Sequence, residues 1–136
     1  MNRIEHLGIA VENLEEANEV FKKILGKAHY KVETVEREGV STSFFELGDS
    51  KIELLEAKNE NSAIHKFIKA RGQGMHHVAI AVDDIKAEMQ RLKDEGFTLL
   101  SEEPFKGADN KWVCFLHPKT TSHVLVELCQ DIDPAE

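Results

Sequence analysis

The chain has 136 residues, 41% of them hydrophobic, and its 17 Lys and Arg against 25 Asp and Glu give a formal net charge of −8. This length and hydrophobic content fit one ordinary globular domain, and the acidic balance argues against a general nucleic-acid footprint. Apolar runs are far shorter than the ~20 residues needed to cross a bilayer, and no secretory leader is recognisable. We therefore expect one soluble, cytoplasmic domain over residues 1–136 that binds neither nucleic acid nor membrane.

The chain contains an internal repeat. Residues 4–11 (IEHLGIAV) are echoed by residues 75–82 (MHHVAIAV), and residues 51–55 (KIELL) are echoed by residues 125–129 (LVELC). The first motif of each half places a histidine ahead of Ile-Ala-Val, and the second has a glutamate at its centre. Self-similarity of this kind indicates one structural unit used twice.

Both halves predict the same order of elements. The first motif reads as a strand, and helical apolar spacing follows it at residues 14–25 and 85–92. Strand-like runs at residues 40–47 and 112–117 precede the second motif. Each half therefore predicts a strand, a helix and then three strands, or βαβββ.

The segment between the halves, residues 58–74, has a polar start and apolar positions typical of a short helix. We predict an α+β fold in which tandem modules, residues 1–57 and 75–136, are joined by this linker helix. No low-complexity tract interrupts the pattern.

Four polar residues stand out on the predicted strands: His6, Glu53, His77 and Glu127. Side chains alternate between the faces of a strand, so the large apolar neighbours turn to the helices and leave each histidine on a face lined by Gly or Ala. A carboxylate on an otherwise apolar strand is costly to desolvate unless a cation neutralises it. Two imidazoles and two carboxylates suit Zn, Co, Ni or Mn, so we predict that the four converge on one divalent cation in an open cleft.

Simpler roles compete with metal binding at each of these positions. A single strand histidine is more often a hydrogen-bonded structural group, and a single strand glutamate is more often solvated; the duplicated pairing is what favours a metal. The unrepeated histidines are expected to have surface or local structural roles: His29, His65 and His117. His76 alternates to the opposite face, and we expect it to pack against a helix or to hydrogen-bond to a metal ligand. The role of His123 is left open.

The repeated module resembles the vicinal oxygen chelate superfamily, which includes glyoxalase I, extradiol dioxygenases and methylmalonyl-CoA epimerases. It is most similar to the epimerases at residues 47–55 (LGDSKIELL), 74–79 (GMHHVA), 115–119 (FLHPK) and 124–128 (VLVEL). The resemblance implies a curved, half-barrel mixed sheet around a metal cleft and a homodimer. It also implies His6, His77 and Glu127 as ligands, with Glu53 where relatives place a fourth glutamate or a glutamine.

The same resemblance implies an isomerase acting on an acyl-CoA. Such an epimerase interconverts (R)- and (S)-methylmalonyl-CoA by removing and returning a proton at C2 through an enolate that a divalent metal (Co, Mn, Zn or Ni) stabilises. Glu127 is expected to be one base, and Glu53 is the weaker candidate for the other. The alternatives are a glyoxalase I-type lactoylglutathione lyase and a metal-free small-ligand-binding protein of the same fold.

The chain departs from its relatives at three places. Residues 107–110 read GADN where relatives commonly have Gly-Ala-x-Gly, and Ser122-His123 replace a glycine-rich turn. Thr42 stands where some relatives carry a catalytic glutamate, so the second base is unassigned. Three lysines are candidates for contacts with coenzyme A phosphates: Lys106, Lys111 and Lys119.

Overall fold

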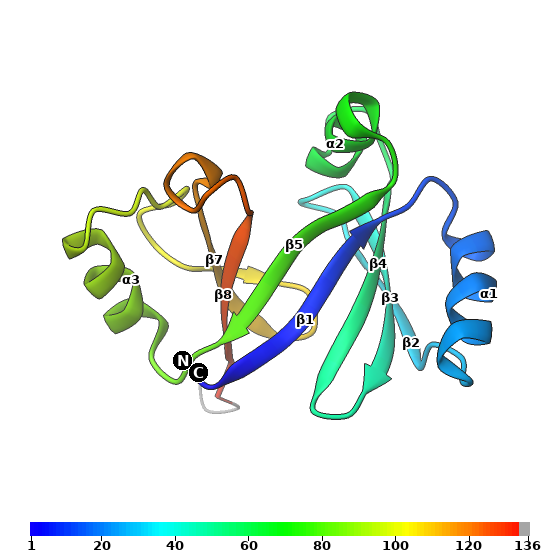
Figure 1. Cartoon of the computed structure of the whole chain (residues 1–136), viewed down its shortest axis with the longest axis horizontal. Helices are drawn as coiled ribbons and strands as arrows, with labels where there is room; N and C mark the ends of the chain where they lie inside the picture. Colours follow the sequence, from blue (N-terminus) through cyan, green and yellow to red (C-terminus); the bar gives the residue numbers. More distant parts are fainter. Residues whose placement is uncertain (134–136) are drawn as a thin grey trace. The chain divides into compact units, whose positions relative to one another are not determined.

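The computed structural model describes residues 1–133 and has an α+β fold. Both halves of the chain show the predicted order of a strand, a helix and three strands, and the helix between them is also present (Figure 1). No helix within residues 1–133 is long and apolar enough to cross a membrane. The elements in chain order are β1 (Arg3–Ala10), α1 (Leu14–Leu25), β2 (Lys31–Val35), β3 (Val40–Leu47), β4 (Ser50–Ala57), α2 (Ala63–Arg71), β5 (Gly74–Ala81), α3 (Ile85–Asp94), β6 (Phe105–Gly107), β7 (Lys111–Leu116), the 3₁₀ turn η1 (Pro118–Thr120) and β8 (Val126–Asp131).

The chain divides into two compact units, which correspond closely to the two modules. The N-terminal unit comprises residues 6–76, and the C-terminal unit comprises residues 1–5 together with the chain from His77 onward. Strands run in the order β2-β3-β4-β1 in the first unit and β5-β8-β7-β6 in the second. In each unit the first strand pairs in parallel with the last, and the remaining pairs are antiparallel.

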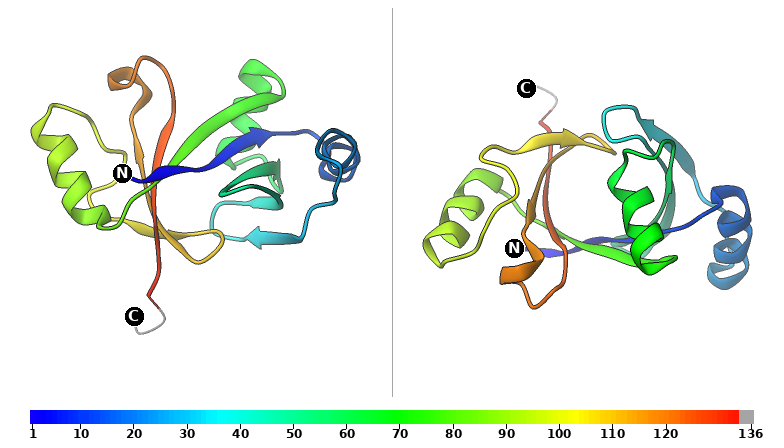
Figure 2. Two further views of the ribbon diagram at one scale, coloured as in Figure 1. Left: turned by 60° about the horizontal axis from the view of Figure 1, so that its bottom comes forward. Right: turned by 90° about the horizontal axis from the view of Figure 1, so that it is seen from above.

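Helices cover both faces of the sheet in the N-terminal unit. Leu54 packs with α1 and Leu55 packs with α2, because consecutive residues of β4 point to opposite faces. Figure 2 shows these two helices on different sides of the strands. Glu53 lies two residues from Leu55, so it shares the face of β4 on which Leu55 packs with α2.

In the C-terminal unit, α3 packs on one face of β7 and β8 (Figure 1). The cluster beneath it includes Leu128 of β8, which is fully buried. Glu127 is the adjacent residue and therefore points away from α3. The other buried members of this cluster are Val82, Ile85, Met89, Leu92, Cys114 and Leu116.

The start of each module helix is tied to the last strand of its own module. The backbone N–H of Leu14 donates to Glu56 Oε2 (2.8 Å), and that of Ile85 donates to Gln130 Oε1 (2.7 Å). Both acceptors lie three residues after the repeated glutamate of their strand. The first N–H groups of a helix have no partner within it. The same bond in each module satisfies one of them and fixes the helix against the strand.

We predict that Glu56→Ala lowers the free energy of unfolding by about 1–2 kcal/mol, because an N-terminal N–H of α1 loses its acceptor. Glu56→Gln keeps the acceptor that Gln130 provides in the other module, so it should lose less than half as much. Urea denaturation of the two variants measures the difference. Equal stability of Glu56→Ala and the parent chain would contradict a stabilising role for this hydrogen bond.

Candidate metal centre

The N-terminal unit brings the predicted residues His6 and Glu53 together. In the parallel pairing of β1 and β4, Gly8 is the register partner of Glu53, so His6 lies one pleat away on the same face. The His6 Nδ1 atom is 3.0 Å from Glu53 Oε2. Both residues are 5% exposed.

The C-terminal unit repeats this arrangement with His77 and Glu127. Ala79 is the register partner of Glu127 in the parallel pairing of β5 and β8, which places His77 one pleat away. The His77 Nε2 atom is 3.3 Å from Glu127 Oε1, and the residues are 7% and 6% exposed. The two modules therefore repeat the strand register and the His–Glu contact as well as the sequence motifs.

The geometry and donor types of each pair fit neighbouring ligands of one cation. Two ligands at ~2.1 Å from a metal lie ~3.0 Å apart at octahedral angles and ~3.4 Å apart at tetrahedral angles, and both observed separations fall in this interval. An imidazole nitrogen with a carboxylate oxygen suits Zn, Co, Ni or Mn. Burying the carboxylates requires a compensating positive charge, from a bound ion or a protonated imidazole. That all four residues hold a single cation stays a prediction.

Thr42 lies on the same face as Glu53. Phe44 is the register partner of Glu53, and Thr42 is two residues from Phe44 on β3. The threonine is 2% exposed, and its hydroxyl is not a base near neutral pH. The side chain of Thr42 therefore shares a face with the His6–Glu53 pair but does not supply a carboxylate.

Three other histidines have the structural roles that were expected. His76 packs edge-on against Phe67 of α2, with ring centroids 5.0 Å apart. His117 caps η1, where its Nδ1 accepts a hydrogen bond from the Lys119 N–H at 3.1 Å. His29 lies against the ring of Phe45 at 5.8 Å.

The candidate lysines differ in their surroundings. Lys111 forms an ion pair with Asp131, its register partner across β7 and β8, and its side chain is only 11% exposed. Sequence reasoning missed this partner, because the pairing of the two strands is what opposes the residues. Lys106 and Lys119 are exposed.

Two loops, at residues 109–110 and 122–123, have a backbone typical of glycine. Asp109 and Asn110 have φ values of 58° and 54°, and Ser122 and His123 have values of 57° and 68°. Asn and Asp tolerate this left-handed region, whereas other side chains cost roughly 1–2 kcal/mol per residue there. Ser122 and His123 therefore hold a backbone conformation that glycine adopts at lower cost.

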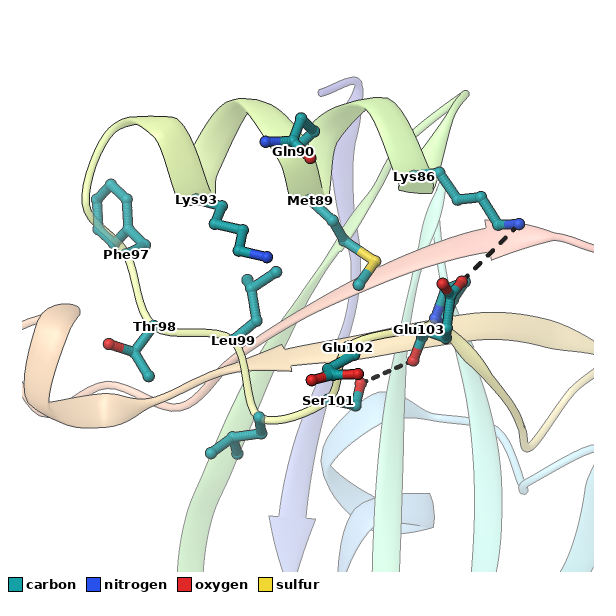
Figure 3. Close-up of a pocket in the computed structure, with 12 residues that line it drawn as sticks. Lys86, Met89, Gln90, Lys93, Phe97, Thr98, Leu99, Ser101, Glu102 and Glu103 are labelled. Atoms are coloured by element: carbon teal, nitrogen blue, oxygen red, sulfur yellow. Dashed lines mark hydrogen bonds and ion pairs between the residues drawn. The ribbon is translucent and has the colours of Figure 1, made fainter.

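A groove of about 650 Å³ lies between α3 and residues 97–104, as Figure 3 shows. Its lining mixes apolar Met89 and Leu99 with charged Lys86 and Glu103, which form an ion pair at 3.9 Å. The groove lies on the α3 side of the strands, and none of the four predicted ligands lines it. It is therefore distinct from both His–Glu pairs.

Residues 5–115 match the model of the Glyoxalase/Bleomycin resistance protein/Dioxygenase superfamily. The chain belongs to this superfamily. The matched residues include His6, Glu53 and His77. The structure confirms the fold class expected from the sequence, with tandem βαβββ modules and a mixed sheet.

Similar proteins cover nearly the whole chain. The human mitochondrial methylmalonyl-CoA epimerase is 43% identical over 96% of this chain and 74% of its own length. The ethylmalonyl-CoA/methylmalonyl-CoA epimerase of Cereibacter sphaeroides is 40% identical over 96% of this chain and 98% of its own length. Among solved structures, a Streptomyces coelicolor methylmalonyl-CoA epimerase variant in complex with 2-nitronate-propionyl-CoA has a TM-score of 0.91 and 32% identity, and it covers 98% of this chain and 99% of that chain.

Acid should destabilise this superfamily member through His76. Burial lowers the pKa of His76 from 6.5 to about 4. Between these values the unfolded chain binds a proton that the folded chain does not, so the free energy of unfolding falls as the pH is lowered through this window. His76→Phe keeps a ring against Phe67 and should reduce the dependence of the free energy of unfolding on pH in this window.

Urea denaturation between pH 7 and pH 4, with chelator present, measures this pH dependence for the parent and the variant. The guanidinium of Arg71, 5.7 Å from the Phe67 ring centroid, is present in both proteins. Parallel curves for the two proteins would show that His76 does not titrate as described.

Proposed function

We propose that the chain is a metal-dependent isomerase that interconverts (R)- and (S)-methylmalonyl-CoA. The observation that carries this proposal is the buried His–Glu pair that each module holds on the sheet face turned away from α1 or α3. The named activity of the human and Cereibacter relatives supports this substrate. The Streptomyces epimerase structure holds an acyl-CoA, which supports the same class of ligand.

The two pairs would together hold one divalent cation. His6, His77 and Glu127 are the firmer ligands and Glu53 is the fourth, with Co, Mn, Zn and Ni as suitable ions. When bound, the ion would offset the negative charge that develops on the thioester oxygen during reaction. The four protein groups would leave room for substrate oxygens on a six-coordinate ion.

Inversion at C2 needs a proton removed from one face of the carbon and one returned to the other. We assign the removal to Glu127: its carboxylate forms the new O–H bond while the C–H electrons pass into the enolate. Return of a proton to the opposite face rebuilds the C–H bond and completes the inversion. Glu53 is the weaker candidate for the group on that face: its carboxylic acid form would give up the proton to the enolate carbon and be left as a carboxylate.

A glyoxalase I-type lactoylglutathione lyase uses similar metal chemistry and is the second candidate. It is less well supported, because the human and Cereibacter relatives, which match 96% of this chain, are named as epimerases. A metal-free binding protein explains the duplicated, buried His–Glu pairs poorly. By family resemblance we also propose a homodimer, and the two cysteines, which form no CxxC pair, favour a cytoplasmic location.

Epimerase activity should depend on a divalent metal and on Glu127. After chelation and re-addition of cobalt or manganese, deuterium from solvent should enter C2 of methylmalonyl-CoA, and Glu127→Gln should reduce kcat by roughly 100-fold or more. Glu56→Gln, which lies on the opposite face of its strand, serves as the control and should retain activity. Deuterium exchange without any metal, or no exchange with any metal, would contradict the proposal. A lactoylglutathione lyase assay on the same preparation tests the second candidate.

Metal stoichiometry tests whether the two pairs share one ion. If they do, the parent binds one cobalt per chain, and His6→Ala and His77→Ala each abolish most of the high-affinity binding. His117→Ala, at a histidine that caps a turn, should bind cobalt like the parent. Two equivalents in the parent, with one lost in each ligand variant, would instead show two separate sites.

A further inference from the structure

An aromatic ring lies directly across the strands from each glutamate of the two pairs. Phe44 of β3 is the register partner of Glu53, and Phe115 of β7 is the register partner of Glu127. Opposed residues of an antiparallel pair point to the same face with their Cβ atoms roughly 5 Å apart. Each module therefore sets a phenylalanine beside its candidate ligand carboxylate.

In the C-terminal unit this ring also meets the imidazole. The rings of Phe115 and His77 are nearly perpendicular, at 86°, with centroids 5.8 Å apart. Phe105 of β6 stacks on Phe115 at 6.4 Å and 28°. His77 thus contacts Glu127 through its Nε2 and Phe115 through its ring, and Phe105 supports the phenylalanine from the neighbouring strand.

The N-terminal unit supports its ring differently. Phe44 is fully buried, and the ring of Tyr30 lies 6.2 Å away from it. The Lys31 Nζ atom sits over the same ring at 4.6 Å from its centroid, a cation–π geometry. Both modules therefore place a phenylalanine beside the glutamate. Phe115 differs from Phe44 in its edge-to-face contact with an imidazole, that of His77.

We propose that Phe115 is a positioning residue for His77 and Glu127, an inference that rests on the proposed metal site. Its ring limits imidazole rotation and excludes water from one side of the pair, so less ordering is needed when a cation binds. Groups that orient metal ligands typically change affinity by about 10–100-fold when removed. Phe115 itself supplies no ligand atom and no proton.

Cobalt titration followed by visible absorption tests this role, with Phe97→Leu as the matched control. Phe97 is another partly buried phenylalanine of the same unit, but it packs on the cluster that contains Leu128, on the face of β8 opposite Glu127. It lines the groove shown in Figure 3. Both Phe115→Leu and Phe97→Leu lose apolar packing and stability. Only Phe115→Leu should weaken cobalt binding by about tenfold or more and alter the absorption bands.

Two further variants separate the ring from its volume. Phe115→Tyr keeps the ring and should bind cobalt like the parent. Phe115→Met keeps the bulk without a ring and should bind cobalt as weakly as Phe115→Leu. It replaces Phe115→Leu in the test if that variant does not fold. Parent-like cobalt affinity in Phe115→Met, or equal weakening in Phe97→Leu, would overturn the positioning role. Failure of the parent chain to bind cobalt would instead overturn the proposed metal site.

Discussion

Parallel pairing between the first and last strands of each module brings the candidate site residues together. His6 and Glu53 are far apart in sequence, as are His77 and Glu127, and only the register of β1 with β4 and of β5 with β8 sets them side by side. The module helix lies between the paired strands in the chain, and Glu56 or Gln130 holds its first turn against the last strand. A slip of one residue would turn a glutamate to the helix face.

The buried pairs are costly for folding, which makes them informative about function. Two nearly inaccessible carboxylates beside two imidazoles stabilise a fold less than apolar residues of similar size would. Their repetition at equivalent positions implies a use that compensates for this cost. Cation binding does so directly, because a ligand that binds only the folded chain stabilises it.

Repetition made much of this structure predictable from the sequence. The two motifs located β1, β4, β5 and β8, and strand alternation placed the histidines and glutamates on the faces away from the module helices. Each half was also expected to hold a further strand that the sequence did not locate. In the structure these are β2, in which intermediate and exposed residues alternate, and β6, which has only three residues.

Contacts that depend on strand register could not be predicted from one sequence. The placement of Phe115 beside His77 and of Lys111 beside Asp131 follows from which backbone groups pair across strands. Local patterns specify the face of a residue but not its neighbour on the adjoining strand. Similarly, Ser122 and His123 adopt a left-handed backbone that their residue types do not predict.

The hydrogen bonds that Glu56 and Gln130 accept from the module helices also show what each duplicated position requires. Glu56 and Gln130 occupy equivalent places, and one has a carboxylate where the other has a neutral amide, since a helix N–H requires only a lone pair. Glu53 and Glu127 both retain a carboxylate, although burial makes an amide cheaper to accommodate. The two copies within one chain therefore differ where the fold needs only a hydrogen-bond acceptor, and they agree at the glutamates of the two His–Glu pairs.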